Sequence, residues 1–286
     1  MKTAEEKLLI LENILLQLGQ VAVAFSGGVD SALLLAVAHR VLGKNAIAVT
    51  AVSRVVPLRE QNEAREFCSS RNIPQLIYEF DELQVPGFRS NPVDRCYHCK
   101  KSLFTGLASL AAEQGAYTLV EGSNMDDMGD YRPGLRALKE LQITSPLREA
   151  GLTKAEIRIL AKKLGLAEWS KPSYSCLASR FAYGEEITAE GLARVEAAEA
   201  MLYDLGLSQF RVRVHGKLAR IEVLQEDMAV IIDNRSAILH KFKELGFAYT
   251  ALDLGGYSSG SMNIGLQECL LKKFYDRIVI FTSEGE

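Results

Sequence analysis

The first group of residues that could do chemistry is the segment 26–31, which has the sequence Ser-Gly-Gly-Val-Asp-Ser. Gly27 and Gly28 carry no Cβ, so the backbone could approach an anion closely there. Ser26 and Ser31 add hydroxyl donors, and Asp30 could cap a helix or help hold Mg²⁺. Neither of the two common glycine-rich phosphate motifs is present. The segment predicts a phosphate site, with an ordinary tight turn as the alternative.

The residues on either side of this segment predict a strand before it and a helix after it. The apolar run 21–25 is short and stops at the glycines, as a buried parallel strand does. The run 32–42 has the length of a helix and ends at Gly43. A strand, a glycine loop and a helix in this order aim free N–H groups and the positive end of a helix at one point.

The second group consists of Cys96, Cys99 and Cys176, the first two in a Cys-x-x-Cys pair. Three thiolates could bind an iron–sulfur cluster and leave a fourth iron open to chemistry. Zinc would need His98 as a fourth ligand from between the paired cysteines. A redox or persulfide-forming pair with a separate nucleophile, and three unrelated buried cysteines, are the other interpretations. Cys68 and Cys269 are expected to serve packing.

A third group is the segment 210–215, in which Arg211 and Arg213 alternate with apolar residues. This alternation predicts a half-buried strand with both arginines on one face, where they could clamp a phosphate or a carboxylate. The alternative is a solvated face paired with carboxylates such as Glu222. Glu199 lies on the preceding predicted helix and could be either helix surface or a catalytic carboxylate.

The elements that must position these residues alternate between strand and helix. Strands are expected at 21–25, 46–52, 75–80 and 117–121, with helices at 4–18, 58–71, 100–114 and 153–165. The stretch 81–95, with its prolines and glycine, is expected to be an exposed loop, and 125–134 a polar loop. This alternation predicts an α/β fold with a doubly wound parallel sheet, in which ligands bind at the carboxyl ends of the strands.

That edge of the sheet would gather the segment 26–31 with Ser53, Gly122 and Asn124. A boundary near residue 180 divides the chain into a domain 1–180 and a smaller α+β domain 181–286. The smaller domain is expected to hold helices at 188–204 and 236–245 and strands at 210–215, 218–224 and 249–254.

Composition restricts the class of protein. The chain has 286 residues, a formal net charge of −3 and a pI of about 5.9, which argues against a large nucleic-acid footprint. Five cysteines without an export signal favour thiol or metal chemistry over disulfides. No apolar run reaches the length of a transmembrane helix, so we expect a cytoplasmic protein that does not bind a membrane.

The segment 26–31 resembles the PP-loop of the ATP pyrophosphatases, which cut ATP between its α and β phosphates. Over nearly its whole length the chain resembles the LarE family of ATP-dependent sulfur transferases, which build the nickel-pincer nucleotide cofactor of lactate racemase. The resemblance rests on five segments, which are 26–31, 130–134, 175–184, 211–213 and 252–260. It implies that one carboxylate of a pyridinium dicarboxylate mononucleotide is adenylated and that sulfur then displaces AMP.

The resemblance also implies site residues and cofactors. Members with three cysteines matching Cys96, Cys99 and Cys176 look like carriers of a [4Fe-4S] cluster with an extra sulfide, whereas other members consume the single cysteine matching Cys176. ATP and Mg²⁺ are expected at the following residues: Ser26, Gly27, Gly28, Asp30, Ser31, Ser53, Gly122 and Asn124. Arg211 and Arg213 would hold the substrate phosphate, and Arg180 would line the same cleft.

Three other functions are compatible with parts of this pattern. A tRNA thiolase also pairs a PP-loop with a three-cysteine cluster, although the acidic pI disfavours it. An amide-forming adenylating enzyme would need an ammonia source, and a sensor would bind ATP without releasing pyrophosphate. The segment 255–261 could serve a subunit contact, and the resemblance suggests a homo-oligomer that receives sulfur from a donor not identifiable in the sequence.

Overall fold

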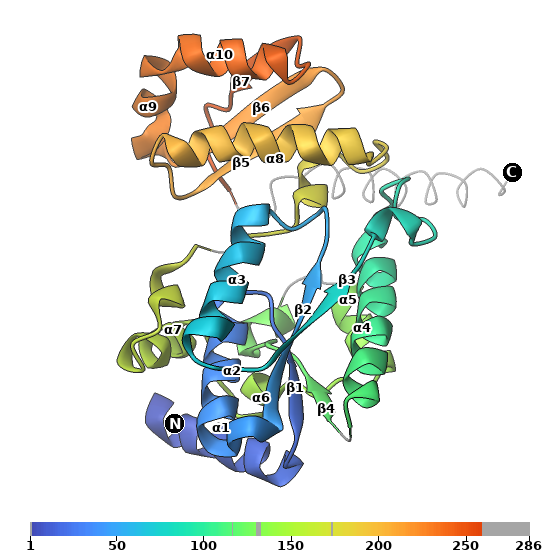
Figure 1. Ribbon diagram of the computed structural model, residues 1–286. Coiled ribbons are helices and arrows are strands. Elements are labelled where there is room, and N and C mark those ends of the chain that lie inside the picture. Colours follow the sequence, from blue (N-terminus) through green and yellow to red (C-terminus); the bar gives the residue numbers. More distant parts are fainter. Residues whose placement is uncertain (1, 116, 130–132, 173, 259–286) are drawn as a thin grey trace, which may run out of the picture. The chain divides into compact units, whose positions relative to one another are not determined.

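The computed structural model describes residues 2–115, 117–129, 133–172 and 174–258, and the chain divides into two compact units (Figure 1). The first unit comprises Met1–Leu177 and Ile187–Ala189. The second comprises Ala178–Glu186 and Glu190–Glu286. Each unit has its own sheet, which is described separately below.

The first unit is built on a four-stranded parallel sheet with the order β3-β2-β1-β4. Its strands are β1 (Val21–Ala24), β2 (Ala46–Val52), β3 (Gln75–Glu79) and β4 (Thr118–Val120). The register pairs Val21 with Ala46 on one side and with Thr118 on the other. All four strands therefore present their carboxyl ends at one edge, as the sequence predicted.

Helices connect these strands and continue beyond the last one. The α-helices of the first unit are α1 (Ala4–Leu18), α2 (Val29–Leu42), α3 (Leu58–Ser70), α4 (Arg95–Glu113), α5 (Pro133–Glu140), α6 (Pro146–Glu149) and α7 (Lys154–Lys163). Short 3₁₀ turns are η1 (Gly43–Asn45), η2 (Glu82–Gln84), η3 (Met125–Gly129) and η4 (Ala167–Ser170).

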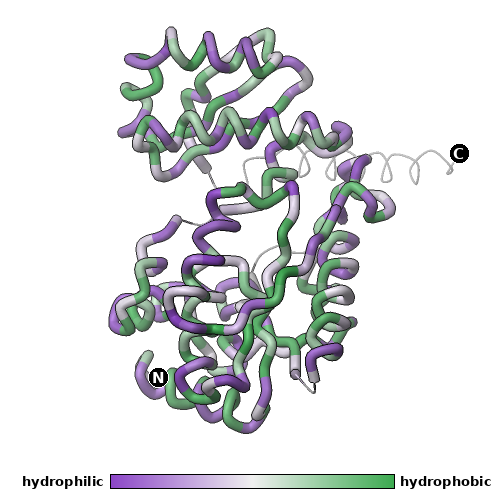
Figure 2. The backbone as a smooth tube through the Cα atoms, in the orientation of Figure 1, coloured by the Kyte–Doolittle hydropathy of each residue, from purple (hydrophilic) through white to green (hydrophobic). Residues whose placement is uncertain are grey.

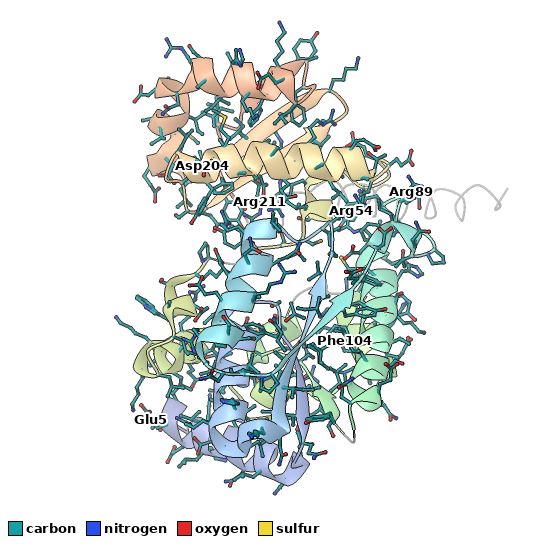
Figure 3. All side chains as sticks on the ribbon, viewed as in Figure 1. Glu5, Arg54, Arg89, Phe104, Asp204 and Arg211 are labelled. Carbon is teal, nitrogen blue, oxygen red and sulfur yellow. The ribbon has the colours of Figure 1, made fainter. Side chains whose placement is uncertain are left out.

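Alternate residues of the strands face two separate cores, one on each side of the sheet. Val21 and Val23 of β1 pack with α1, α2 and α7, whereas Ala22 packs with α4. Phe104, labelled in Figure 3, lies in this second core. Figure 2 shows that β1, β2 and much of α2 are hydrophobic, which is the composition that strands buried on both faces require. The prediction of an α/β fold with a doubly wound sheet is confirmed.

Capping residues fix where two of the helices begin. Thr3 and Glu6 form a capping box at α1, and Thr153 and Glu156 form the predicted one at α7. In each box the threonine side chain accepts a hydrogen bond from the glutamate N–H, and the glutamate side chain accepts one from the threonine N–H. The expected helices 4–18 and 153–165 are accordingly found within two residues of their predicted limits.

The stretch 81–95 differs in part from the prediction of an exposed loop, because buried residues alternate with its exposed ones. Phe88 and Asn91 are buried, and so are Glu82 and Arg95 at its two ends. Helix α4 begins at Arg95, five residues earlier than expected, so that Cys96 and Cys99 lie in its first turns. The predicted polar loop 125–134 instead contains η3 and the beginning of α5, while residues 130–132 lie outside the described residues.

The second unit packs helices on a three-stranded sheet with the order β5-β6-β7. Its elements are η5 (Leu177–Arg180, which begins at the last residue of the first unit), α8 (Ala189–Asp204), β5 (Phe210–His215), β6 (Leu218–Val223), η6 (Gln225–Asp227), α9 (Met228–Asp233), α10 (Arg235–Glu244) and β7 (Tyr249–Leu252). Strands β5 and β6 are antiparallel, and β7 adds to β6 in parallel. Cys269 and residues 259–261 of the segment 255–261 lie outside the described residues.

Candidate active site

The segment 26–31 forms a turn between β1 and α2. Gly28 is the N-cap residue of α2, and no side chain caps the first turn of this helix. Gly27 has φ +74°, and a Cβ there would lie 3.4 Å from the Ala64 Cβ on α3. Glycine therefore allows the turn and its close approach to α3. The uncapped N–H groups of α2 and its positive end are suited to an anion.

The two serines of the loop interact with each other. Their hydroxyl oxygens lie 3.2 Å apart, and the Ser31 hydroxyl donates to the Gly28 carbonyl oxygen at 3.1 Å. The Ser31 oxygen also accepts a hydrogen bond from the Ser26 N–H. Ser26 is exposed, while Ser31 is buried beneath it. The buried serine therefore fixes the turn, and the exposed one remains accessible to a ligand.

Asp30 joins the loop to residues that follow β4. Asn124 Nδ2 donates to Asp30 Oδ1 at 3.3 Å. A Cβ on Gly122 would lie 3.1 Å from the Ser31 nitrogen and 3.3 Å from the Asp30 Cβ, so that only glycine allows this approach. The structure thus brings Gly122 and Asn124 to the glycine loop, as expected from the shared edge of the sheet.

Two lysines that the sequence did not indicate also reach this loop. Lys154 Nζ donates to Asp30 Oδ2, and its backbone N–H donates to Asp126. Lys171 Nζ donates to the Gly27 carbonyl oxygen at 3.2 Å and pairs with Glu63 at 2.5 Å. The loop itself contains no cation, and these lysines supply positive charge from distant parts of the chain. The only hint in the sequence was the position of Lys154 at the start of a capped helix.

Ser53 lies at the carboxyl end of β2 and is buried. Its backbone carbonyl oxygen accepts a hydrogen bond from Gln61 Nε2 at 2.9 Å. Its hydroxyl lies near the carboxyl group of Glu82 but makes no hydrogen bond of ordinary geometry among the described residues. Ser53 therefore lies close to Glu82, the residue whose carboxyl group influences the Cys99 thiol.

The three cysteines are brought together, although Cys176 comes from a distant loop. The Leu177 N–H donates to the Val55 carbonyl oxygen at 2.8 Å, which ties the Cys176 loop to the chain after β2. Burial raises the pKa of the Cys99 thiol, and negative charge at Cys176, Glu82 and Cys96 raises it further. These influences show that the other two thiols and Glu82 lie near Cys99, whose own surroundings have low polarity.

A metal centre would need at least three of these side chains to converge. Within the described ranges, no three His, Cys, Asp or Glu side chains are placed to hold a metal ion, which supports neither the zinc nor the iron–sulfur interpretation. The donor chemistry suits an iron–sulfur cluster better, because each cysteine would bind a different iron. One buried oxygen, Glu82 Oε2, has no hydrogen-bond partner among the described residues and lies in the same environment. The [4Fe-4S] cluster stays a prediction.

Two charged residues of this environment were missed by the sequence interpretation. Glu82 is 3% exposed, and burial raises its pKa. Arg95 is 4% exposed, and its Nη2 donates to Cys96 Sγ at 3.8 Å. Both belong to the stretch 81–95, whose prolines and polar residues suggested exposure. No local pattern in the sequence shows that this stretch is buried against the thiols.

In the second unit the predicted anion clamp is a set of buried charges. Strand β5 is buried on both faces except at His215, so the expectation of a half-buried strand was wrong. Arg213 donates to Glu222 through Nε at 3.0 Å, and its Nη1 donates to the Ser179 carbonyl oxygen. The pair of Arg213 with Glu222 that was expected on a solvated face is therefore present, but it is buried. The two charges can be buried because each compensates the other.

Arg211 and Glu199 lie in the same unit. Arg211, labelled in Figure 3, is 2% exposed and lies 5.1 Å from the ring centroid of Tyr257. Burial and the charge of Arg180 lower its pKa. Glu199 is buried, which excludes the helix-surface interpretation. It accepts hydrogen bonds from Arg180 Nε at 2.9 Å and from the Val212 N–H at 2.9 Å.

The fold and the first unit's site define a class: an α/β protein in which a glycine loop at the start of α2 and a group of three cysteines follow the carboxyl ends of strands of one parallel sheet. No family model matches the chain. It is 36% identical over 275 residues to the pyridinium-3,5-bisthiocarboxylic acid mononucleotide synthase of Lactiplantibacillus plantarum, a match that covers 96% of this chain and 100% of the synthase.

Two uncharacterised proteins are also similar. One, from Synechocystis sp., is 42% identical over 261 residues, which are 91% of this chain and 97% of the relative. The other, from Methanocaldococcus jannaschii, is 30% identical over 240 residues, which are 84% of this chain and 91% of the relative. The chain belongs to the LarE family, the family of the synthase, and this prediction is confirmed. Among the described helices, none is long and apolar enough to cross a membrane.

Proposed function

We propose that this chain uses ATP to activate a carboxylate of pyridinium-3,5-biscarboxylic acid mononucleotide and replaces an oxygen of that carboxylate by sulfur. One observation carries the proposal: the glycine loop and the thiol group lie at the carboxyl edge of the same sheet. The loop follows β1, whereas Ser53 and Glu82 beside the thiols follow β2 and β3. The similarity to the synthase supports the identity of the product.

The residues around the loop are suited to ATP. The N–H groups of α2 and the Ser26 hydroxyl would bind phosphate oxygens. Lys154 would move from Asp30 to the departing pyrophosphate, whose charge exceeds what neutral donors can offset. Mg²⁺, when bound, would neutralise phosphate charge, and Asp30 and Asn124 are the oxygen-bearing side chains that would hold it.

The thiol group would then deliver the sulfur. A carboxylate is a poor electrophile, and adenylation gives it a good leaving group. Cys96, Cys99 and Cys176 would hold a [4Fe-4S] cluster, which when bound supplies a transferable sulfide at its open iron. If no cluster is present, the alternative is that Cys176 gives up its own sulfur. In both cases the low polarity around Cys99 excludes water that would hydrolyse the activated carboxylate.

The second unit supplies the residues proposed for the substrate phosphate. Arg211 and Arg213 are buried guanidinium groups, and a phosphate would gain strongly from a cation that has already lost its water. Glu199 holds Arg180 in a two-point ion pair, with Oε1 and Oε2 at 2.9 Å and 2.8 Å. We propose that this pair keeps the guanidinium of Arg180 oriented rather than reacting itself.

The test separates activation from sulfur transfer. Wild-type chain with ATP, Mg²⁺ and the dicarboxylate nucleotide should release pyrophosphate and form a thiocarboxylate, detected by mass spectrometry. Cys176→Ala should still release pyrophosphate but form no thiocarboxylate, because only the second half-reaction needs the thiol. Cys68→Ala, which changes a buried cysteine on α3, should retain both activities.

Two results would contradict the proposal. One is absence of substrate-dependent pyrophosphate release by the wild-type chain, which is the behaviour of a sensor. The other is release that depends on tRNA instead of the nucleotide, which is the behaviour of a tRNA thiolase. Iron and sulfide analysis of the anaerobically purified chain distinguishes the cluster from the sacrificial cysteine. A cytoplasmic location, a homo-oligomer and an external sulfur donor stay predictions.

A further inference from the structure

Lys171 reaches the glycine loop from a part of the chain that is far from it in sequence. Its Nζ donates to the Gly27 carbonyl oxygen at 3.2 Å and pairs with Glu63 of α3 at 2.5 Å. The Lys171 side chain is only 16% exposed, so most of its length is already buried. Gly27 directly precedes Gly28, the N-cap residue of α2. A cation therefore lies beside the N–H groups that are suited to a phosphate.

The backbone around Lys171 is held by Arg158 of α7. The Arg158 Nη2 donates to the Lys171 carbonyl oxygen at 2.9 Å, and its Nη1 donates to the Trp169 carbonyl oxygen. One guanidinium group thus bridges two carbonyl oxygens in η4 and the residue that follows it. Because the backbone and much of the lysine side chain are ordered in advance, less conformational entropy is lost when Lys171 binds an anion.

The loop has a cation on each of two sides. Lys154 contacts Asp30, to which Asn124 after β4 also donates. Lys171 contacts Gly27, which packs against α3, the helix that follows β2. Strand β1, from which the loop leaves the sheet, lies between β2 and β4 (Figure 1). Lys154 therefore approaches the loop from the β4 side, and Lys171 approaches it from the β2 side.

The cysteine loop lies on the same side as Lys171. The Leu177 N–H donates to the Val55 carbonyl oxygen at 2.8 Å, and Val55 lies between β2 and α3. In the proposed function, cleavage of ATP leaves AMP on the carboxylate and releases pyrophosphate. The carboxylate must face the cysteines if sulfur is to replace AMP, so the α-phosphate that carries it belongs on the β2 side. The pyrophosphate then belongs on the β4 side.

We propose that Lys171 binds the α-phosphate of the nucleotide and of the adenylated carboxylate, whereas Lys154 binds the pyrophosphate. This division of the two lysines rests on the proposed function, which fixes the side of the carboxylate. Glu63 holds Lys171 in place before the nucleotide binds, and a phosphate oxygen then replaces the Glu63 carboxylate. The Glu63 side chain is 39% exposed and keeps Arg59 as a partner at 3.5 Å, so its release costs little.

The experiment measures the affinity of the full-length chain for AMP, magnesium pyrophosphate and adenosine by isothermal titration calorimetry, without the carboxylate substrate. Lys171→Gln should weaken AMP binding about tenfold and leave pyrophosphate binding within about twofold, because one charge-assisted hydrogen bond is lost. Lys154→Gln should have the reverse effect. Adenosine carries no phosphate, so an unchanged affinity for adenosine shows that each variant is folded.

The Glu63 partner distinguishes a phosphate-binding lysine from a structural ion pair. A structural pair would lose affinity whichever partner is removed, whereas a competing carboxylate gives effects of opposite sign. Glu63→Gln should therefore tighten AMP binding about threefold, the strength of a half-exposed ion pair. Lys171→Arg should retain most of the AMP affinity, since it keeps the charge.

The matched control is Lys7→Gln. The Lys7 side chain is 18% exposed, close to the value for Lys171, and it pairs with Glu156 at 2.7 Å. Lys7 lies on α1 and joins this helix to α7, so its removal costs an ion pair of similar burial. The affinity for AMP should stay unchanged.

Four results would overturn the inference. These are unchanged AMP affinity in Lys171→Gln, equal losses of AMP and pyrophosphate affinity in either lysine variant, weaker AMP binding by Glu63→Gln, and a wild-type chain that binds neither AMP nor pyrophosphate. Pyrophosphate release from ATP with the dicarboxylate nucleotide is measured on the same preparations. A chain that shows the division between the lysines but releases no pyrophosphate would count against the proposed function alone. Turnover of Lys171→Gln with wild-type kcat and wild-type KM for ATP would count against the inference alone.

Discussion

The glycine loop of the first unit and strand β5 of the second were both predicted to bind anions, yet they are built by opposite means. The loop leads into the uncapped N–H groups of α2, exposes the Ser26 hydroxyl and contains no cation of its own. Strand β5 carries guanidinium groups that are buried, and Arg213 is already paired with Glu222. The loop therefore offers hydrogen-bond donors without a charged side chain among them. Strand β5 carries charged side chains, of which Arg213 is paired within the fold.

The difference teaches that charge in a sequence does not by itself distinguish a binding site from a structural ion pair. A buried guanidinium needs a partner for stability, whether or not a ligand ever binds. A glycine turn with uncapped donors at the edge of a parallel sheet has no comparable structural need. The comparison therefore predicts that substitutions at β5 act first on stability and substitutions in the loop act first on binding.

The largest effect is expected for Glu222→Leu. Glu222 is 0% exposed and pairs with Arg213 at 2.9 Å and Arg220 at 3.1 Å. Its removal leaves buried guanidinium charge uncompensated and should lower the free energy of unfolding by about 3–5 kcal/mol. Urea denaturation followed by circular dichroism measures this loss.

The control for this substitution is Glu244→Leu, on α10 of the same unit. Glu244 is about half exposed and pairs with Lys241 at 3.7 Å. Its removal should change the free energy of unfolding by less than about 0.5 kcal/mol. Equal effects of the two substitutions would show that the β5 pair is not a structural necessity, and the contrast with the loop would disappear.

A smaller effect, on binding alone, is expected for Gly28→Ala. Gly28 has φ −79°, which alanine adopts readily, and its Cβ would meet only the Ser26 hydroxyl oxygen at 3.6 Å. The free energy of unfolding should stay within about 0.5 kcal/mol of the wild-type value. The new methyl group occupies space that a phosphate needs, so the affinity for Mg·ATP should fall about tenfold, or about 1.4 kcal/mol, by calorimetry.

Gly27→Ala gives the contrast within the same loop. Its φ of +74° strains any L-residue, so this variant should lose about 1 kcal/mol of stability in addition to affinity. If Gly28→Ala bound Mg·ATP as tightly as the wild-type chain, the loop would be a structural turn and not a phosphate site.

The same contrast explains what could be predicted from the sequence. The loop and its flanking elements were predictable because their signal is contiguous: an apolar run, two glycines, and a second apolar run that ends at Gly43. The limits of α1 followed from leucines at helical spacing and Gly19. Cys96, Cys99 and Cys176 could be proposed as a group from the Cys-x-x-Cys spacing and a third cysteine in a later loop, and the structure places the other two near Cys99.

What could not be predicted depends on contacts between residues far apart in the chain. Lys154 reaches Asp30 across 124 residues, and no local pattern shows this. The burial of Phe88 and Asn91 was missed because prolines and polar residues usually indicate an exposed loop. The alternation of charged and apolar residues in β5 predicted a half-buried strand, whereas the strand is buried on both faces. The sequence does not show that Arg213 is paired with Glu222 in the interior.

The smallest effect is expected at Glu82, a buried carboxyl group of the first unit. Its Oε2 has no hydrogen-bond partner among the described residues, whereas Glu222 is paired with two arginines. Burial raises its pKa in the folded chain above the ordinary value of 4.5. The folded state then binds more protons than the unfolded state between those two pKa values, so stability falls as pH rises through that window. Below the unfolded pKa this loss is absent.

Glu82→Gln removes the titrating group and should therefore flatten this part of the stability profile, with a change in slope of at most about 1.4 kcal/mol per pH unit. At neutral pH the variant should be more stable than the wild-type chain, the opposite sign to Glu222→Leu. Urea denaturation from about pH 4 to 8 measures both, with Glu79→Gln, at an exposed position of β3, as the control. Parallel profiles for Glu82→Gln and the wild-type chain would mean that the Glu82 carboxyl is satisfied in solution, as the Glu222 carboxyl is by Arg213 and Arg220.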